Sequence, residues 1–286
     1  MAVIYDVFGD ESHDEENERV FAVAGVLGDE ADWQTATEAW TNRTRGRIFH
    51  ASDCECDLND FSESSHAENL RLYADLAKIL GGSRLMGFGA AMSLEDYDKF
   101  FAPSLRNNAY YLCFRTVILY LGRMARRIIP QGIIRFTFDH NLETENNAAK
   151  VYDFVVNMPG TDFKEYLDDE ISFSSRRNPK IQVADLMARE TMKHFDNQFG
   201  PVYRISRRSF QTLADSKRFA FEFYTKHYFA DLVQKANDLA KGQGYTTILQ
   251  EFTEWRAIHN NAPDTLEVRI RYAMSQLKQN PEVNPF

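Results

Sequence analysis

The sequence lacks the features that mark membrane, secreted and zinc-stapled proteins. No apolar run in its 286 residues approaches the roughly 18 residues needed to span a bilayer, and its first residues do not pair a basic stretch with an apolar one. Three cysteines give no disulfide framework, and Cys54 and Cys56 alone are too few to hold zinc. We therefore expect a soluble, cytoplasmic protein that makes no contact with a membrane.

The sequence also lacks the glycine-rich loops that hold nucleotide phosphates. Neither G-x-x-x-x-G-K-[ST] nor G-x-G-x-x-G occurs in it. This absence argues against enzymes that use nucleoside triphosphates or dinucleotides. Internal repeats and low-complexity tracts are missing as well.

The charge balance is not that of a protein whose whole surface grips nucleic acid. The chain has 33 basic and 42 acidic residues and a net charge of −9, whereas such a surface is normally basic. Local basic clusters could still touch phosphate, or they could be solvated faces and helix C-termini. These clusters are Arg43, Arg45 and Arg47; Arg123, Arg126 and Arg127; Arg176, Arg177 and Lys180; Arg204, Arg207 and Arg208.

The composition, with 44% hydrophobic and 13% aromatic residues, can bury a substantial core. Apolar patterns predict alternating strands and helices up to a soft boundary near residue 200, and only helices beyond it. We expect strands at 3–9, 20–27, 84–92, 133–139 and 171–174, and helices at 31–43, 67–80, 104–129, 146–157, 181–195, 216–239, 245–259 and 264–277, with a short helix or turn at 94–101. This predicts an α/β domain over residues 1–200 and a helical C-terminal extension over 201–286.

Three aspartates stand out by their positions. Asp10 ends the first predicted strand, Asp139 ends a central one, and Asp185 is a lone charge among the apolar residues of a helix. An unpaired buried charge is costly, so Asp185 needs a partner or a metal if it is buried. The small residues Ala184 and Ala188 would let this helix approach a sheet closely, which would bring Asp185 toward the strand ends.

Three converging carboxylates would form a hard-oxygen site suited to Mg²⁺ or Mn²⁺. Two such ions about 3.5–4 Å apart can activate a water and stabilise the leaving oxygen of a phosphodiester. The alternative is structural: Asp139 would cap a turn, and Asp185 would pair with Arg189 one helical turn further on. Spacing alone leaves both interpretations open.

Three short motifs resemble the domain of unknown function 3800 family. They are Asp10-Glu11-Ser12 after the opening strand, Phe49-His50-Ala51, and Ile181-Gln182-Val183-Ala184-Asp185-Leu186 after a serine-rich turn. They occur in the family's order over roughly residues 1–200. The family is similar to ribonuclease-H-like nucleases and integrases, so the resemblance implies a mixed central sheet flanked by helices. It also implies acids on the first strand, the fourth strand and a late helix, which match Asp10, Asp139 and Asp185.

The sequence departs from the family's pattern in two ways. His13 stands where the family usually has a glycine, and an acidic run follows it. No fourth acid is obvious, since Glu11 would point away from Asp10 if the strand persists. Asp53 or Glu143 could take that place.

Three polar residues near these motifs have ambiguous roles. His50 could position a water, donate a proton, or satisfy a hydrogen bond in the core. His140, beside Asp139, could be a ligand or solvent-exposed. Gln182 lies one helical turn before Asp185 and could orient it.

The last third of the sequence is rich in aromatic residues interleaved with Lys217, Arg218, Lys226 and Arg256. Such residues could stack bases. Their helical spacing favours a core or a homodimer interface formed by the C-terminal helices. The aromatic residues are Phe219, Phe221, Phe223, Tyr224, Tyr228, Phe229, Phe252 and Trp255.

Together these features predict a Mg²⁺- or Mn²⁺-dependent nuclease that hydrolyses phosphodiesters of DNA or RNA. The predicted metal ligands are Asp10, Asp139 and Asp185, and Glu11 and His50 complete the candidate catalytic residues. The main alternative is an inactive ribonuclease-H-like module that binds nucleic acid or a protein partner. A metal-dependent hydrolase of small phosphate esters is a weaker third hypothesis.

Overall fold

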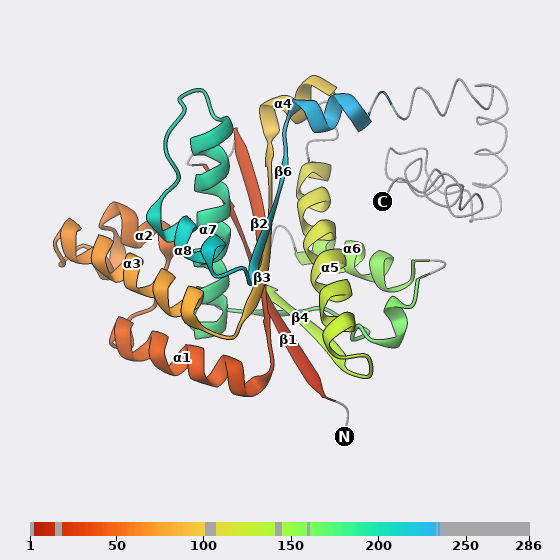
Figure 1. Cartoon of the computed structure of the whole chain (residues 1–286), viewed down its shortest axis with the longest axis horizontal. Coiled ribbons are helices and arrows are strands. Elements are labelled where there is room, and N and C mark those ends of the chain that lie inside the picture. The colour runs from red at the N-terminus through yellow and green to blue at the C-terminus, as the bar shows by residue number, and fades with distance from the viewer. Residues whose placement is uncertain are drawn as a thin grey trace, which may run out of the picture.

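The computed structural model describes residues 3–14, 19–100, 107–140, 145–158, 161–232 and 234. A central sheet runs through the molecule, and helices cover both of its faces (Figure 1). The helices over one face are α1, α2, α3, α7 and α8, while α5 and α6 cover the other. Their bounds are Glu30–Thr44 (α1), Ala51–Cys56 (α2), His66–Gly82 (α3), Leu94–Phe100 (α4), Asn107–Ile128 (α5), Glu145–Val156 (α6), Pro179–Phe199 (α7) and Arg208–Asp215 (α8).

The sheet has six strands in the order β5-β4-β1-β2-β3-β6. Only β2 runs against its neighbours: it is antiparallel to β1 and β3, whereas the other neighbouring pairs are parallel. The bounds are Ile4–His13 (β1), Val20–Gly28 (β2), Met86–Ser93 (β3), Ile133–Asp139 (β4), Ser172–Ser174 (β5) and Phe219–Tyr224 (β6). The predicted fold class, an α/β fold of ribonuclease-H-like type with a mixed sheet flanked by helices, is confirmed.

The opening hairpin forms as predicted, but its first strand is longer than expected. β1 pairs with β2 from Asp6, opposite Gly28, to His13, opposite Phe21. Asp10 therefore lies inside the strand and does not end it. The reason is that β2 supplies hydrogen-bonding partners for four more residues than the apolar run alone suggested.

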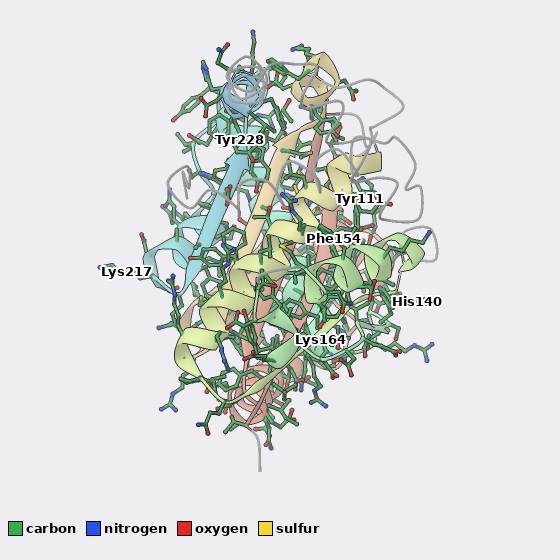
Figure 2. All side chains as sticks on the ribbon, turned by 90° about the vertical axis from the view of Figure 1, so that its right-hand side faces the viewer. Tyr111, His140, Phe154, Lys164, Lys217 and Tyr228 are labelled. Atoms are coloured by element: carbon green, nitrogen blue, oxygen red, sulfur yellow. The ribbon has the colours of Figure 1, made fainter. Side chains whose placement is uncertain are left out.

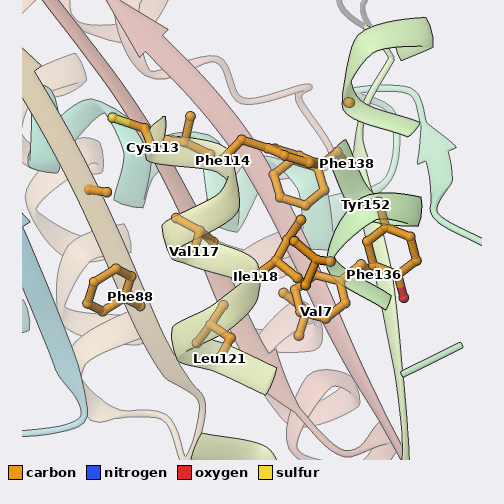
Figure 3. Packing of buried hydrophobic residues seen from close by; sticks show 14 of the residues in the cluster. Val7, Phe88, Cys113, Phe114, Val117, Ile118, Leu121, Phe136, Phe138 and Tyr152 are labelled. Carbon is orange, nitrogen blue, oxygen red and sulfur yellow. The ribbon is translucent and has the colours of Figure 1, made fainter. Parts of the chain in front are cut away.

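Both faces of the sheet are buried, which explains the unbroken apolar run of β2. On one face α5 packs against β2 and β3. In Figure 3, Val7 and Phe136 of neighbouring strands lie against Ile118 of α5. On the other face α7 packs against β1, β2 and β3.

Close approach of α7 to the sheet depends on small residues. Ala184 and Ala188 of this helix are fully buried. On the facing strand, any side chain at Gly89 would collide with Thr191. The helix begins at Pro179, after Asn178 caps it through a side-chain contact to the Lys180 amide of 3.0 Å.

The predicted helix at 216–239 is wrong over Phe219–Tyr224, which form strand β6. Because β6 pairs with β3, the central sheet includes a segment of the region predicted to be a helical extension. Figure 2 places Lys217, just before β6, and His140, just after β4, on opposite sides of the molecule, in agreement with the strand order. The predicted helices at 245–259 and 264–277, and the homodimer interface expected from them, lie outside the described residues.

Candidate metal-binding site

Two strands place Asp10 and Asp139 side by side. The parallel register between β1 and β4 ends with Gly9 opposite Phe138, and the next residue on each strand is one of the two aspartates. Residues in register on neighbouring strands point to the same face of a sheet. Phe8 belongs to the core on the α7 side, so alternation along β1 directs Asp10 toward α7 as well.

Helix α7 brings the third acid to the same place. The Asp185 side chain is 5% exposed and Asp10 is 4% exposed, so both are buried. The backbone N–H of Ala51 donates a hydrogen bond of 2.7 Å to Oδ2 of Asp185. The sequence prediction that the helix would carry Asp185 toward the two strands agrees with this arrangement.

The three carboxylates act on one another electrostatically. Burial raises the pKa of Asp10 well above its usual range, and the charges of Asp185 and Asp139 raise it further. The Glu11 amide, which donates a hydrogen bond of 2.7 Å to Asp10 Oδ1, and the charge of Arg176 lower it only in part. Like charges held this close favour a bound cation.

Asp185 has a milder environment than Asp10. Burial raises its pKa, while the charge of His50 and the hydrogen bond from Ala51 oppose that rise. The positive charges of Arg176 and Arg189 act in the same direction as His50. The segment before and at the start of α2 therefore surrounds Asp185 with groups that favour its ionised form.

Asp139 is held by an arginine. Nε of Arg176 lies 3.1 Å from Oδ2 of Asp139. Burial disfavours the charged guanidinium, but the hydrogen bond to Asp139 and the charges of Asp10, Asp139 and Asp185 outweigh burial and raise the pKa of Arg176. Asp139 thus forms an ion pair, which differs from the turn-capping role considered as a structural alternative.

The ion pair between Asp185 and Arg189, considered as the structural alternative, is not the contact that Arg189 makes. Arg189 Nε lies 2.8 Å from Oε2 of Glu55 on α2. Arg207 also pairs with Glu55. Glu55 therefore takes up the arginine that spacing along α7 had assigned to Asp185.

His50 is the residue before α2 and lies at the rim of the site. Its Nδ1 is 3.1 Å from Oδ1 of Asp53 and 3.2 Å from Oγ of Ser52. Asp53 also accepts a hydrogen bond of 2.8 Å from the side chain of Asn59. One candidate for a fourth acid is therefore engaged with His50 and Asn59, and the other, Glu143, lies outside the described residues.

A pocket of about 730 Å³ opens at this end of the sheet. Asp10, Asp139 and Asp185 all line it. The other lining residues include the two further catalytic candidates, Glu11 and His50, together with two more histidines, two arginines and several aromatic rings. They include Glu11, His13, His50, His140, Arg176, Arg189, Tyr110, Phe138 and Phe173. Strand alternation directs Glu11 away from Asp10, so the pocket wraps around the sheet rather than lying on one face of it.

The donor types fit a divalent cation, but the side chains are not gathered around one point. Within the ranges that the structure describes, no group of three or more His, Cys, Asp or Glu side chains is arranged to hold a metal ion. The Asp139 carboxylate is instead drawn to Arg176. Three carboxylates in one pocket remain a donor set of the kind that Mg²⁺ and Mn²⁺ prefer.

Sequence reasoning did not assign the role of Gln182. Its Oε1 accepts hydrogen bonds of 3.1 Å from Trp40 Nε1 and from the Phe49 amide, and its Nε2 donates one of 2.8 Å to the carbonyl of Arg176. Gln182 therefore connects α1, the segment before α2 and the segment before α7. The role considered from the sequence was a different one, the direct orientation of Asp185. A glutamine in an otherwise apolar helix stretch was the signal for a buried hydrogen-bonding role.

No family model matches the sequence, and no curated protein matches it. A chain of a solved structure described as the PCNA:RNase HII complex from Archaeoglobus fulgidus is similar to it, with 14% sequence identity and a TM-score of 0.38. The match covers 73% of this chain and 87% of that chain. The fold assignment given above comes from the order and directions of the strands. The resemblance to the domain of unknown function 3800 family stays a prediction.

Proposed function

We propose that this protein is a metal-dependent nuclease that hydrolyses phosphodiester bonds of DNA or RNA. The observation that carries this proposal is the convergence of Asp10, Asp139 and Asp185, from two strands and a helix, on one pocket. Burial and mutual repulsion make this cluster unfavourable without a cation. A structural role gives no reason to place three acids together.

Asp10, Asp139 and Asp185 would hold Mg²⁺ or Mn²⁺. When bound, such an ion supplies Lewis acidity, which activates a water and stabilises the leaving oxygen of a phosphodiester. The carboxylates' own contribution is fixed negative charge in a partly buried pocket, where electrostatic interactions are stronger than in water.

Other residues of the pocket fit an anionic substrate. Arg189 lines the pocket and is held in place by Glu55. His50 also lines the pocket and is partly exposed. A volume of about 730 Å³ is large enough for a nucleotide-sized group.

The test is cleavage of labelled DNA and RNA oligonucleotides in Mn²⁺ by the wild type, Asp185→Asn and Asp215→Asn. Asp185→Asn keeps an oxygen that can accept the Ala51 N–H, so it should fold normally and lose cleavage by at least about 10³-fold. Asp215 is exposed and does not belong to the pocket, so Asp215→Asn should cleave like the wild type. Full activity of Asp185→Asn would rule out the assignment.

A second function, an inactive binding module, is favoured by one observation. Asp139 is already neutralised by Arg176, and the described residues contain no group arranged to hold a metal ion. Thermal melting with Mn²⁺ separates the two functions. A working site should raise the melting temperature by an amount that grows with the logarithm of the Mn²⁺ excess, whereas an inactive module should not respond.

No helix in the described part of the chain is long and apolar enough to cross a bilayer.

A further inference from the structure

Arg176 forms an ion pair with one of the proposed metal ligands, so its contact competes with metal binding there. It follows β5 and precedes α7, and its Nε lies 3.1 Å from Asp139 Oδ2. The Arg176 side chain is 51% exposed, while the side chain of Asp139 is 10% exposed. The guanidinium therefore reaches Asp139 from the solvent side of the pocket.

The backbone of Arg176 is anchored while its side chain is not enclosed. The carbonyl of Arg176 accepts a hydrogen bond of 2.8 Å from the buried side chain of Gln182. Two residues later, Asn178 caps the start of α7. With the main chain fixed, the long side chain can leave Asp139 by rotating about its own bonds, without any change in the fold.

We propose that the Arg176 guanidinium is a resident counter-ion of the carboxylate site, which a divalent cation must displace from Asp139. This inference rests on the proposed function and adds a regulatory step to the same site. With no metal bound, Arg176 offsets part of the repulsion among Asp10, Asp139 and Asp185. When a divalent cation binds, it carries twice the charge of the guanidinium.

The balance of energies makes this exchange feasible. An ion pair with a half-exposed arginine contributes little to stability, so releasing it costs little. A divalent cation bound by two or three carboxylates gains much more, because the ligands are buried and their mutual repulsion is relieved. The arginine thus lowers the affinity for metal without abolishing it.

The ion pair engages Oδ2 of Asp139, while the charges of Asp139 and Asp185 both act on Asp10. A cation held by all three acids would have to compete with Arg176 for that oxygen. Removing the guanidinium should leave the oxygen free for the cation. This predicts a site that becomes better for metal when a positive charge is deleted.

The experiment is calorimetric titration of the full chain with Mn²⁺ alone, without nucleic acid. Arg176→Met keeps most of the apolar stem and removes the charge, so it should bind Mn²⁺ on the order of tenfold more tightly than the wild type. Arg176→Lys restores a positive charge and should return the affinity toward the wild-type value. Arg177→Met is the matched control, because Arg177 is exposed and does not belong to the pocket.

The outcomes separate this inference from the proposed function. Equal Mn²⁺ affinity in the wild type and Arg176→Met would overturn the counter-ion role and leave the metal site standing. Weaker binding by Arg176→Met would also overturn it, since Arg176 would then support the site. If neither protein binds Mn²⁺, both proposals fail. If Arg176→Met does not fold, Arg176→Gln takes its place in the same titration.

Discussion

Two buried acids on helix α7, Asp185 and Glu190, have different neighbours. Glu190 is fully buried, accepts hydrogen bonds of 2.8 Å from the hydroxyls of Tyr73 and Ser209, and lies 3.2 Å from an Arg207 nitrogen. Asp185 accepts one from the Ala51 amide and lines the pocket that also contains Asp10 and Asp139. The helix therefore presents one acid to donors and the other to acids.

Burial raises the pKa of both Asp185 and Glu190, so the direction of the shift does not distinguish them. The place of each side chain does, because Asp185 lines the pocket that Asp10 and Asp139 also line, whereas Glu190 does not. Arg207 and two hydroxyls oppose the rise at Glu190, which marks an acid used for stability. Asp10 has the acids Asp139 and Asp185 as charged neighbours, and such a cluster is typical of a site that binds a cation.

Removing Glu190 should have the largest effect on stability. Glu190→Ala leaves the buried Tyr73 hydroxyl without its partner and removes one of the two carboxylates that pair with Arg207. It should lower the free energy of unfolding by about 3 kcal/mol. Urea unfolding measures this value. Glu63→Ala, at an exposed position, is the control and should change stability very little. A small loss in Glu190→Ala would mean that the two acids of α7 are not different in kind.

Glu55 belongs to the same stabilising cluster, because it pairs with Arg207, and its contribution to stability should depend on pH. Burial works against its ionised form, but Arg207 and Arg189 outweigh burial and hold its pKa below the usual range. A lowered pKa in the folded state stabilises the protein above the unfolded-state pKa, and this contribution is lost as pH falls through the folded-state pKa. Glu55→Gln should therefore cost about 2 kcal/mol at neutral pH.

The cost of Glu55→Gln should shrink once the pH falls below about 4.3, the ordinary pKa of a glutamate. Urea unfolding of the wild type and Glu55→Gln across acidic to neutral pH checks the trend. A cost that does not change with pH would show that Glu55 stabilises by packing alone.

Asp10→Asn should have the smallest effect on stability, and the opposite sign. It removes a buried charge that faces Asp139 and Asp185 while keeping an oxygen for the Glu11 amide. We expect a gain of about 1 kcal/mol at neutral pH, because a carboxyl whose pKa is raised in the folded state destabilises the fold above its unfolded-state pKa. The same variant should lose the rise in melting temperature with Mn²⁺. If Asp10→Asn is less stable than the wild type, the Asp10 carboxylate stabilises the fold and the prediction is wrong.

The sequence was sufficient to predict the strands that carry Asp10 and Asp139, because their apolar runs are strong and local. It placed Asp10 at a strand end, since the extra pairing with β2 is a long-range effect. It missed β6, where Phe219, Phe221 and Phe223 alternate with a period of two inside a stretch that also fits a helix. The local pattern was ambiguous there, and pairing with β3 decided the outcome.

The candidate site was predictable in its acids but not in their partners. Asp185 was visible as a lone charge in an apolar helix. Arg176 lies in a loop and Ala51 begins α2, and both are far along the chain from the acids they contact, so no periodicity links them. Arg189 shows the same limit, because spacing along α7 assigned it to Asp185 whereas the tertiary fold gives it to Glu55.

Gln182 has a consequence for how this molecule opens. One side chain joins α1 through Trp40, the segment before α2 through Phe49, and the segment before α7 through Arg176. These segments are distant in the chain. If any one of them moves away, the buried Gln182 amide loses a hydrogen bond while it is still bound to the other two segments. Local fraying around the pocket is therefore coupled to the loosening of helix α7 itself, and the pocket and the core behave as one cooperative unit in hydrogen exchange.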